Sequence, residues 1–79
     1  MARYTVKLRT PVDIGLALQQ ARLSRDLSQT ELADNVALRQ SVVSEIEGGK
    51  STIYLRQLLA LAAAAGLELQ ATWVDEEAE

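Results

Sequence analysis

The chain has 79 residues, no cysteine and no histidine, and a formal net charge of −3 at pH 7. Disulfides, zinc-finger ligands, thiol nucleophiles and imidazole bases are therefore excluded, so catalysis would rest on carboxylates or hydroxyls alone. We expect no enzyme activity, no catalytic residue, no metal and no cofactor. A chain of this length forms one small domain, and its Phe-free, aliphatic composition favours an all-α fold of packed helices. No apolar run is long enough to predict a membrane span.

The negative charge is concentrated at the C-terminus. Four of the eleven acidic residues, Asp75, Glu76, Glu77 and Glu79, lie in the last five positions, which leaves seven acidic residues against eight basic ones elsewhere. We interpret residues 75–79 as a solvated acidic tail. The overall charge therefore does not exclude a nucleic-acid partner.

Four helices are predicted in the middle of the chain. Thr10 and Pro11 form an N-cap and first helical position, and this first helix should run to about Ser24. Ser28 and Glu31 form a capping box that begins the second helix. Glycines at 48–49 and at 66 should end the third helix and the fourth, which spans roughly 55–65. Only three or four residues separate the second and third helices, a spacing typical of a helix-turn-helix.

The apolar pattern of the first helix leaves one pair unassigned. Leu16 and Leu23 lie one heptad apart, away from the face that carries Ile14 and Leu18. This pair forms either the rim of the core or a contact surface.

Taken together, the helical segments resemble the Cro/cI (Xre) helix-turn-helix family. The resemblance covers about 53 residues and implies a compact four-helix, lambda-repressor-like domain at 11–66 that binds double-stranded DNA. Ala37 departs from the pattern, because the family often has glycine there, and this puts a left-handed turn in doubt. The segments that carry the resemblance are Ile14-Gly15 to Arg22, Leu27-Ser28-Gln29-x-Glu31-Leu32-Ala33, Val43-Ser44-x-Ile46-Glu47-x-Gly49-Lys50, Leu55-x-x-Leu58-Leu59-x-Leu61-Ala62, and Gly66.

The third helix is the expected recognition helix, because its N-terminal part presents polar side chains outward. In the family that the chain resembles, the positions that match Gln40 and Ser41 commonly contact bases, so the resemblance makes Gln40 the first choice. Glutamine can pair with adenine through two hydrogen bonds. Glu45 can accept from cytosine or pair with Arg39 or Arg25. The full set of predicted base-contacting residues is Arg39, Gln40, Ser41, Ser44 and Glu45.

Four further residues are assigned to positioning and structure. Gln29, in the first turn of the second helix, and Lys50, after the glycines, are predicted to contact DNA phosphates. Arg22 and Glu47 match positions that form an internal salt bridge in this family, so the resemblance assigns them to structure.

In two segments at opposite ends of the chain, apolar and polar residues alternate with the period of a β-strand. Residues 3–9 place Tyr4, Val6 and Leu8 on one face, within an N-terminal arm at 1–10. The strands can pair with each other or between two copies of the chain, and we favour an intermolecular sheet in a homodimer, which would present two recognition helices to a palindromic operator. The predicted dimer strand at 67–74 carries Leu67, Leu69, Ala71 and Trp73.

A domain of this type with a C-terminal strand is similar to HipB-like antitoxins. That resemblance implies a cytoplasmic, nucleoid-associated repressor of prokaryotic or phage origin that autoregulates its operon and binds a HipA-like serine/threonine kinase toxin. The alternatives are a stand-alone or phage-type Xre repressor, a restriction-modification controller, and a protein-interaction module that uses Leu16 and Leu23 and never touches DNA. A small hydrolase is the weakest alternative, since no histidine or cysteine is available.

Overall fold

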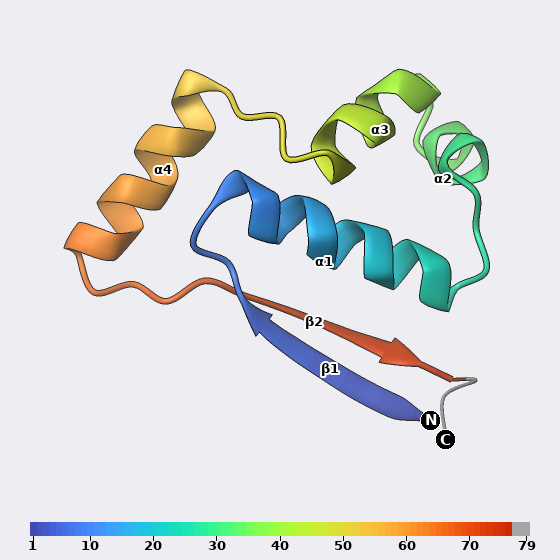
Figure 1. Cartoon of the computed structure of the whole chain (residues 1–79), viewed down its shortest axis with the longest axis horizontal. Helices are drawn as coiled ribbons and strands as arrows, with labels where there is room; N and C mark the ends of the chain where they lie inside the picture. Colours follow the sequence, from blue (N-terminus) through green and yellow to red (C-terminus); the bar gives the residue numbers. More distant parts are fainter. Residues whose placement is uncertain (77–79) are drawn as a thin grey trace.

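A computed structural model describes residues 1–76 of the chain, and Figure 1 shows its elements in order. The predicted tail residues 77–79 lie outside the described part. Within residues 1–76 we find no helix with the length and hydropathy of a membrane span. The elements are β1 (Ala2–Lys7), α1 (Pro11–Ser24), α2 (Gln29–Asn35), α3 (Gln40–Glu47), α4 (Ile53–Ala64) and β2 (Gln70–Asp75).

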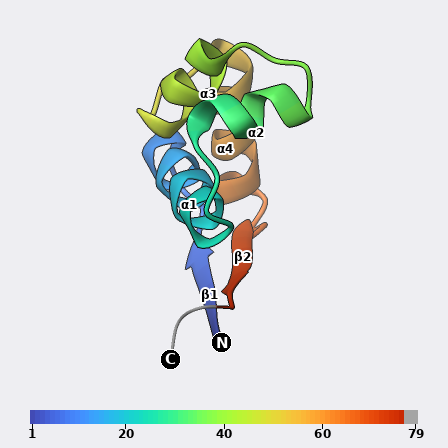
Figure 2. The ribbon, with the colours of Figure 1, turned by 90° about the vertical axis from the view of Figure 1, so that its right-hand side faces the viewer.

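The strands β1 and β2 form an antiparallel two-stranded sheet within one chain. Tyr4 lies opposite Trp73, with ring centroids 5.6 Å apart and stacked. The backbone N–H of Leu8 extends the ladder by donating to the Leu69 carbonyl at 2.9 Å. One face of the sheet packs on α1 (Figure 2). Tyr4, Trp73 and Leu23 line one hollow between the sheet and this helix.

The strands thus pair with each other within one chain, which is one of the two arrangements that the sequence allowed, whereas the favoured pairing between two copies stays a prediction. Because α1 begins and α4 ends on the same side of the molecule, the segments that connect them to the strands bring β1 and β2 together (Figure 1). Ala71 and Trp73 therefore face Val6 and Tyr4 of their own chain. Leu67 lies before the strand and is exposed.

Helix α1 lies between the sheet and the α2–α3 pair (Figures 1 and 2). The Thr10 side chain accepts from the Asp13 N–H, and the Asp13 carboxylate accepts from the Thr10 N–H, so this helix begins with a capping box. Its two buried residues are small, Gly15 and Ala17. Leu16 and Leu23 are about half exposed, so neither is a core residue.

Gly15 permits the closest approach between α1 and α3. A Cβ at this position would lie 2.8 Å from the Glu47 carbonyl oxygen and closer still to the Ile46 carbonyl oxygen. Both of these atoms are backbone, so they cannot rotate away. The last turn of α3 therefore rests directly on the backbone of α1.

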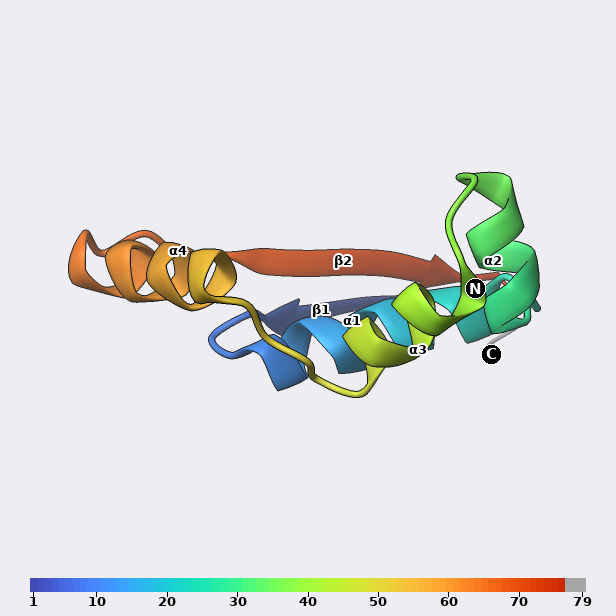
Figure 3. The same ribbon diagram turned by 90° about the horizontal axis from the view of Figure 1, so that it is seen from above.

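Helix α4 stands apart from the other helices, at the opposite end of the molecule from α2 (Figure 3). Leu59 and Ala62 are buried on its inner face, where they and Leu8 line one hollow. The Cα radius of gyration is 13.6 Å, whereas a compact domain of this length has about 11.6 Å. The described chain is thus more open than the compact domain that the resemblance implies. Its buried apolar residues are Ala17, Ala33, Val43, Leu59 and Ala62.

Gly15→Ala should destabilise the protein by about 1–3 kcal/mol, because the overpacking exceeds the gain of about 1 kcal/mol from replacing a helical glycine. Urea unfolding monitored by circular dichroism measures the change. Gly48→Ala is the matched control: its φ of −79° suits alanine, and a Cβ there would lie 3.3 Å from the nearest atom, the Ser44 carbonyl oxygen. An equal effect of the two substitutions would contradict the assigned α1–α3 contact.

Candidate nucleic-acid interface

Helices α2 and α3 form a helix-turn-helix whose start and turn are set locally. Ser28 accepts from the Glu31 N–H at 3.0 Å, and the Glu31 carboxylate accepts from the Ser28 N–H at 3.0 Å. The turn contains Ala37 with a φ of +57°. The doubt about a left-handed turn is therefore wrong: the turn keeps this conformation with alanine, although glycine adopts it at lower cost.

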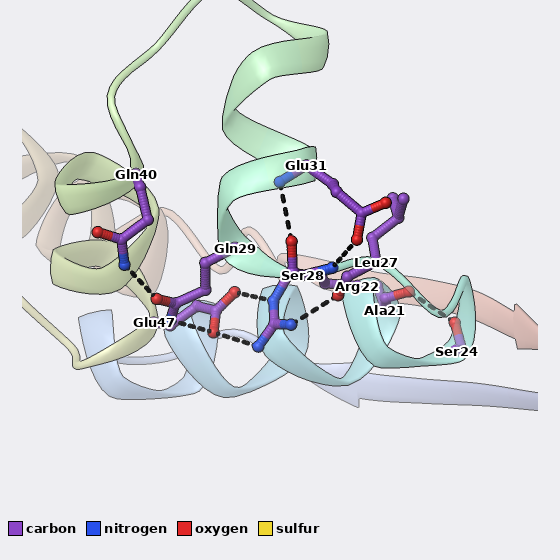
Figure 4. A network of polar contacts seen from close by, with 9 residues as sticks. All are labelled: Ala21, Arg22, Ser24, Leu27, Ser28, Gln29, Glu31, Gln40 and Glu47. Carbon is purple, nitrogen blue, oxygen red and sulfur yellow. Dashed lines mark hydrogen bonds and ion pairs between the residues drawn. The ribbon is translucent and has the colours of Figure 1, made fainter.

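Arg22 of α1 joins three parts of the domain through its guanidinium (Figure 4). Its Nε donates to Glu47 Oε2 at 2.7 Å, and its Nη2 donates to Glu47 Oε1 at 3.0 Å. Its Nη1 donates to the Leu27 carbonyl oxygen at 2.7 Å. The side chains of Arg22 and Glu47 are only 9% and 2% exposed, so both charges are buried and paired.

The ion pair changes the acidity of both groups. The Arg22 hydrogen bonds hold the pKa of the Glu47 carboxyl below its usual value of 4.5, and the Gln29 amide adds to this effect against the opposing cost of burial. Glu47 in turn raises the pKa of Arg22. The pair is therefore fully ionised at neutral pH.

Two glutamines extend this network to the surface (Figure 4). Gln29 Nε2 donates to Glu47 Oε1 at 3.1 Å, and Gln40 Nε2 donates to Gln29 Oε1 at 2.6 Å. The Glu47 carboxylate can only accept hydrogen bonds, so Gln29 must turn its amide nitrogen toward it. The Gln29 amide oxygen then faces Gln40, which must donate its own N–H. Gln40 is left with its amide oxygen and a second N–H, the two groups that adenine N6 and N7 require.

The other predicted contact residues are also exposed on or beside α3. Arg39 is the N-cap residue of the helix and makes no side-chain capping bond. Ser41 and Ser44 are exposed on the helix itself. Glu45 accepts from Lys50 Nζ at 3.0 Å, so its partner is neither Arg39 nor Arg25, the two that the sequence suggested. Such an exposed pair contributes about 0–1 kcal/mol, and a phosphate can therefore compete for Lys50.

Sequence reasoning missed the hydrogen bonds that connect Gln29 to Gln40 and to Glu47. The capping box places Gln29 in the first turn of α2, and the turn length places Gln40 at the start of α3. Neither feature indicates that the two amides meet, because their contact depends on the angle between two helices. The sequence signal for this contact was the polar side chain at the first position of both α2 and α3.

Comparison with known proteins identifies the family. Residues 18–71, more than half of the chain, match the Helix-turn-helix family model, and the chain belongs to this family. The match supports the Cro/cI (Xre) type, whose members are DNA-binding regulators of transcription. Multiprotein-bridging factor 1 of Candida albicans is 32% identical over 68 residues, which cover 86% of this chain and 45% of that protein. The chain thus spans less than half the length of this relative. No solved structure gives a significant match.

Glu47→Gln should lower the free energy of unfolding at pH 7 by about 3–5 kcal/mol, because Arg22 stays buried without its counter-charge. The pKa of Glu47 is lower in the folded state, so its stabilisation is present above pH 4.5 and is lost as the pH falls through the folded value. The variant should therefore lose less stability than wild type on going from pH 5 to pH 3.

Chemical denaturation at several pH values measures this difference. Glu45→Gln is the control, because it removes an exposed carboxylate from the same helix. If Glu47→Gln and Glu45→Gln had equal effects at pH 7, the ion pair would not hold α1 to α3.

Proposed function

We propose that this protein binds a specific duplex DNA sequence by inserting the N-terminal part of α3 into the major groove. The observation that carries this proposal is the amide chain from Glu47 through Gln29 to Gln40. It holds a base-reading amide in one orientation at the exposed start of a recognition helix. Ordering that side chain before binding lowers the entropic cost of the contact.

The proposed contacts fall into two kinds. Gln40 reads adenine, and Arg39, Ser41, Ser44 and Glu45 supply further donors and acceptors toward base edges. Gln29 and Lys50 contact phosphates and set the position of α3 on the duplex, with no reading of sequence. Gln29 therefore has two tasks, because it contacts the backbone and also orients Gln40.

Repression is the regulatory effect that we propose. A protein seated in the major groove excludes other proteins from the same base pairs, and a homodimer would recognise a palindromic operator. The finer role of a HipB-like antitoxin with a HipA-like kinase partner stays a prediction. It rested on chain length, the C-terminal strand and the acidic tail, and the family match does not distinguish it from other helix-turn-helix regulators.

Selection from a random duplex library with the full chain should enrich one sequence motif. At an adenine of that motif, Gln40→Ala should lower affinity about 10- to 100-fold and remove the base preference. Lys50→Ala should weaken all sequences alike and reduce the slope of log affinity against log salt by about 1. Fluorescence anisotropy across a salt series measures both effects.

Gln20→Ala is the matched control for the DNA measurements. It removes the same side chain from α1, where Gln20 lies beside Tyr4 and Trp73 on the side of the sheet. Its affinity and base preference should equal those of wild type. Failure to enrich any motif at low salt, with all three variants behaving like wild type, would overturn the proposal.

A further inference from the structure

The strand β1 has a free edge on the side away from β2. Within residues 1–76 the sheet has only these two strands, and the Leu8 N–H donates to the Leu69 carbonyl in the register of the whole ladder. In an antiparallel pair, every second residue turns its N–H and its carbonyl away from the partner strand. On β1 these residues are Arg3, Thr5 and Lys7, and all three are exposed. The backbone of β1 can therefore pair with one more strand.

The edge of β1 is more open than the edge of β2. Helix α1 packs mainly on β2, and its C-cap residue Arg25 lines one hollow with Thr72 of that strand. Tyr4 and Val6 of β1 lie on the face of the sheet that turns toward α1, yet they are still 43% and 38% exposed. A third strand beside β1 would cover these two side chains with its own apolar residues.

The open edge is also basic. Residues 1–9 contain Arg3, Lys7 and Arg9 and no acidic residue. Arg3 and Lys7 share the face of the sheet that turns away from α1, because side chains alternate along a strand. Lys7 pairs with Glu68 at 3.6 Å, but both side chains are about half exposed. Such a pair is weak, so an incoming carboxylate can compete for Lys7.

The position and charge of β1 limit what can bind there. Helix α1 lies between the sheet and the α2–α3 pair, so β1 is on the far side of the domain from the proposed DNA interface (Figures 1 and 2). A second copy of β1 is disfavoured, because pairing two such strands about Thr5 would place Arg3 of one beside Lys7 of the other. A row of outward backbone groups flanked by cations fits an extended acidic peptide.

We propose that the free edge of β1 binds an extended, acidic segment of another protein as a third strand. The acidic residues of that segment lie beside Arg3 and Lys7, and the apolar residues between them lie over Tyr4 and Val6. This interaction goes beyond the DNA binding proposed for α3 and is measured without DNA. Because the two surfaces lie on opposite sides of α1, one chain can hold DNA and the acidic protein together.

The probe for the charge is a fluorescent peptide, Ser-Glu-Val-Thr-Val-Glu-Ser, which places a glutamate beside each cation in either strand direction. Wild type should bind it at least about tenfold more tightly than the matched peptide with lysine in place of both glutamates. In Arg3→Glu/Lys7→Glu this preference should reverse. The control Arg25→Glu/Arg56→Glu has the same net charge and should keep the wild-type preference. Fluorescence anisotropy measures these affinities, and an unchanged preference in Arg3→Glu/Lys7→Glu would contradict the proposal.

Proline substitutions test the backbone pairing. Thr5→Pro removes an outward N–H from β1 and leaves the ladder with β2 intact, so binding of the acidic peptide should weaken about tenfold. Thr72→Pro is the matched control, because Thr72 lies directly opposite Thr5 and its N–H points to the other edge. Both variants lose the hydrogen bond between the two hydroxyls. Equal peptide binding by the two variants would overturn the proposal.

Amide hydrogen exchange in wild type gives a readout that does not depend on the folding of any variant. A saturating concentration of the acidic peptide should slow exchange of the Thr5 and Lys7 N–H groups and leave that of Thr72 unchanged. Slower exchange at Thr72 alone, or at neither edge, would show that the peptide does not join β1.

Two other occupants of the edge give different results. If a second copy occupies it, wild type sediments as a dimer that Thr5→Pro converts to a monomer. If nucleic acid occupies it, duplex DNA of random sequence displaces the acidic peptide, and Arg3→Glu/Lys7→Glu no longer binds that DNA. Either result would exclude an acidic protein segment as the occupant of the β1 edge.

Discussion

The buried ion pair between Arg22 and Glu47 fixes how the first three helices are placed relative to one another. It joins the last turn of α1 to the last turn of α3, and its third hydrogen bond holds the Leu27 carbonyl just before α2. Gly15 allows the two helices to approach closely enough for this contact. Burying two charges is expensive, and only complete pairing offsets the cost. The pair therefore permits one relative placement of α1, α2 and α3.

The same carboxylate connects stability to recognition. Glu47 accepts from Gln29, which accepts from Gln40, so an ionised group in the core determines how an amide at the surface is turned. The core therefore orients Gln40, whereas the exposed residues around it contribute by their position alone. On the proposed function, the protein needs few basic residues to recognise DNA, since specificity would come from directed hydrogen bonds more than from charge.

Local features of the fold were predictable, and contacts between distant segments were not. The capping residues Thr10 and Ser28 gave the starts of α1 and α2, because an N-cap acts within four residues. The start of α4 was missed by two residues, although Thr52 caps it. The alternation of apolar and polar residues predicted both strands but not which strand each one pairs with. That pairing depends on where α1 begins and where α4 ends. The site residues were chosen by type and position, but the hydrogen bond between Gln29 and Gln40 depends on the angle between two helices.

A double-mutant cycle on Gln29 and Gln40, measured as affinity for the selected DNA site, tests whether Gln29 orients Gln40 for base recognition. Gln29→Ala, Gln40→Ala and the double variant are compared with wild type. If Gln29 orients Gln40, the double variant should lose less affinity than the two single losses combined, and Gln29→Ala alone should weaken the preference for the base that Gln40 reads. Additive losses, with that preference unchanged in Gln29→Ala, would show that the network does not prepare the recognition helix.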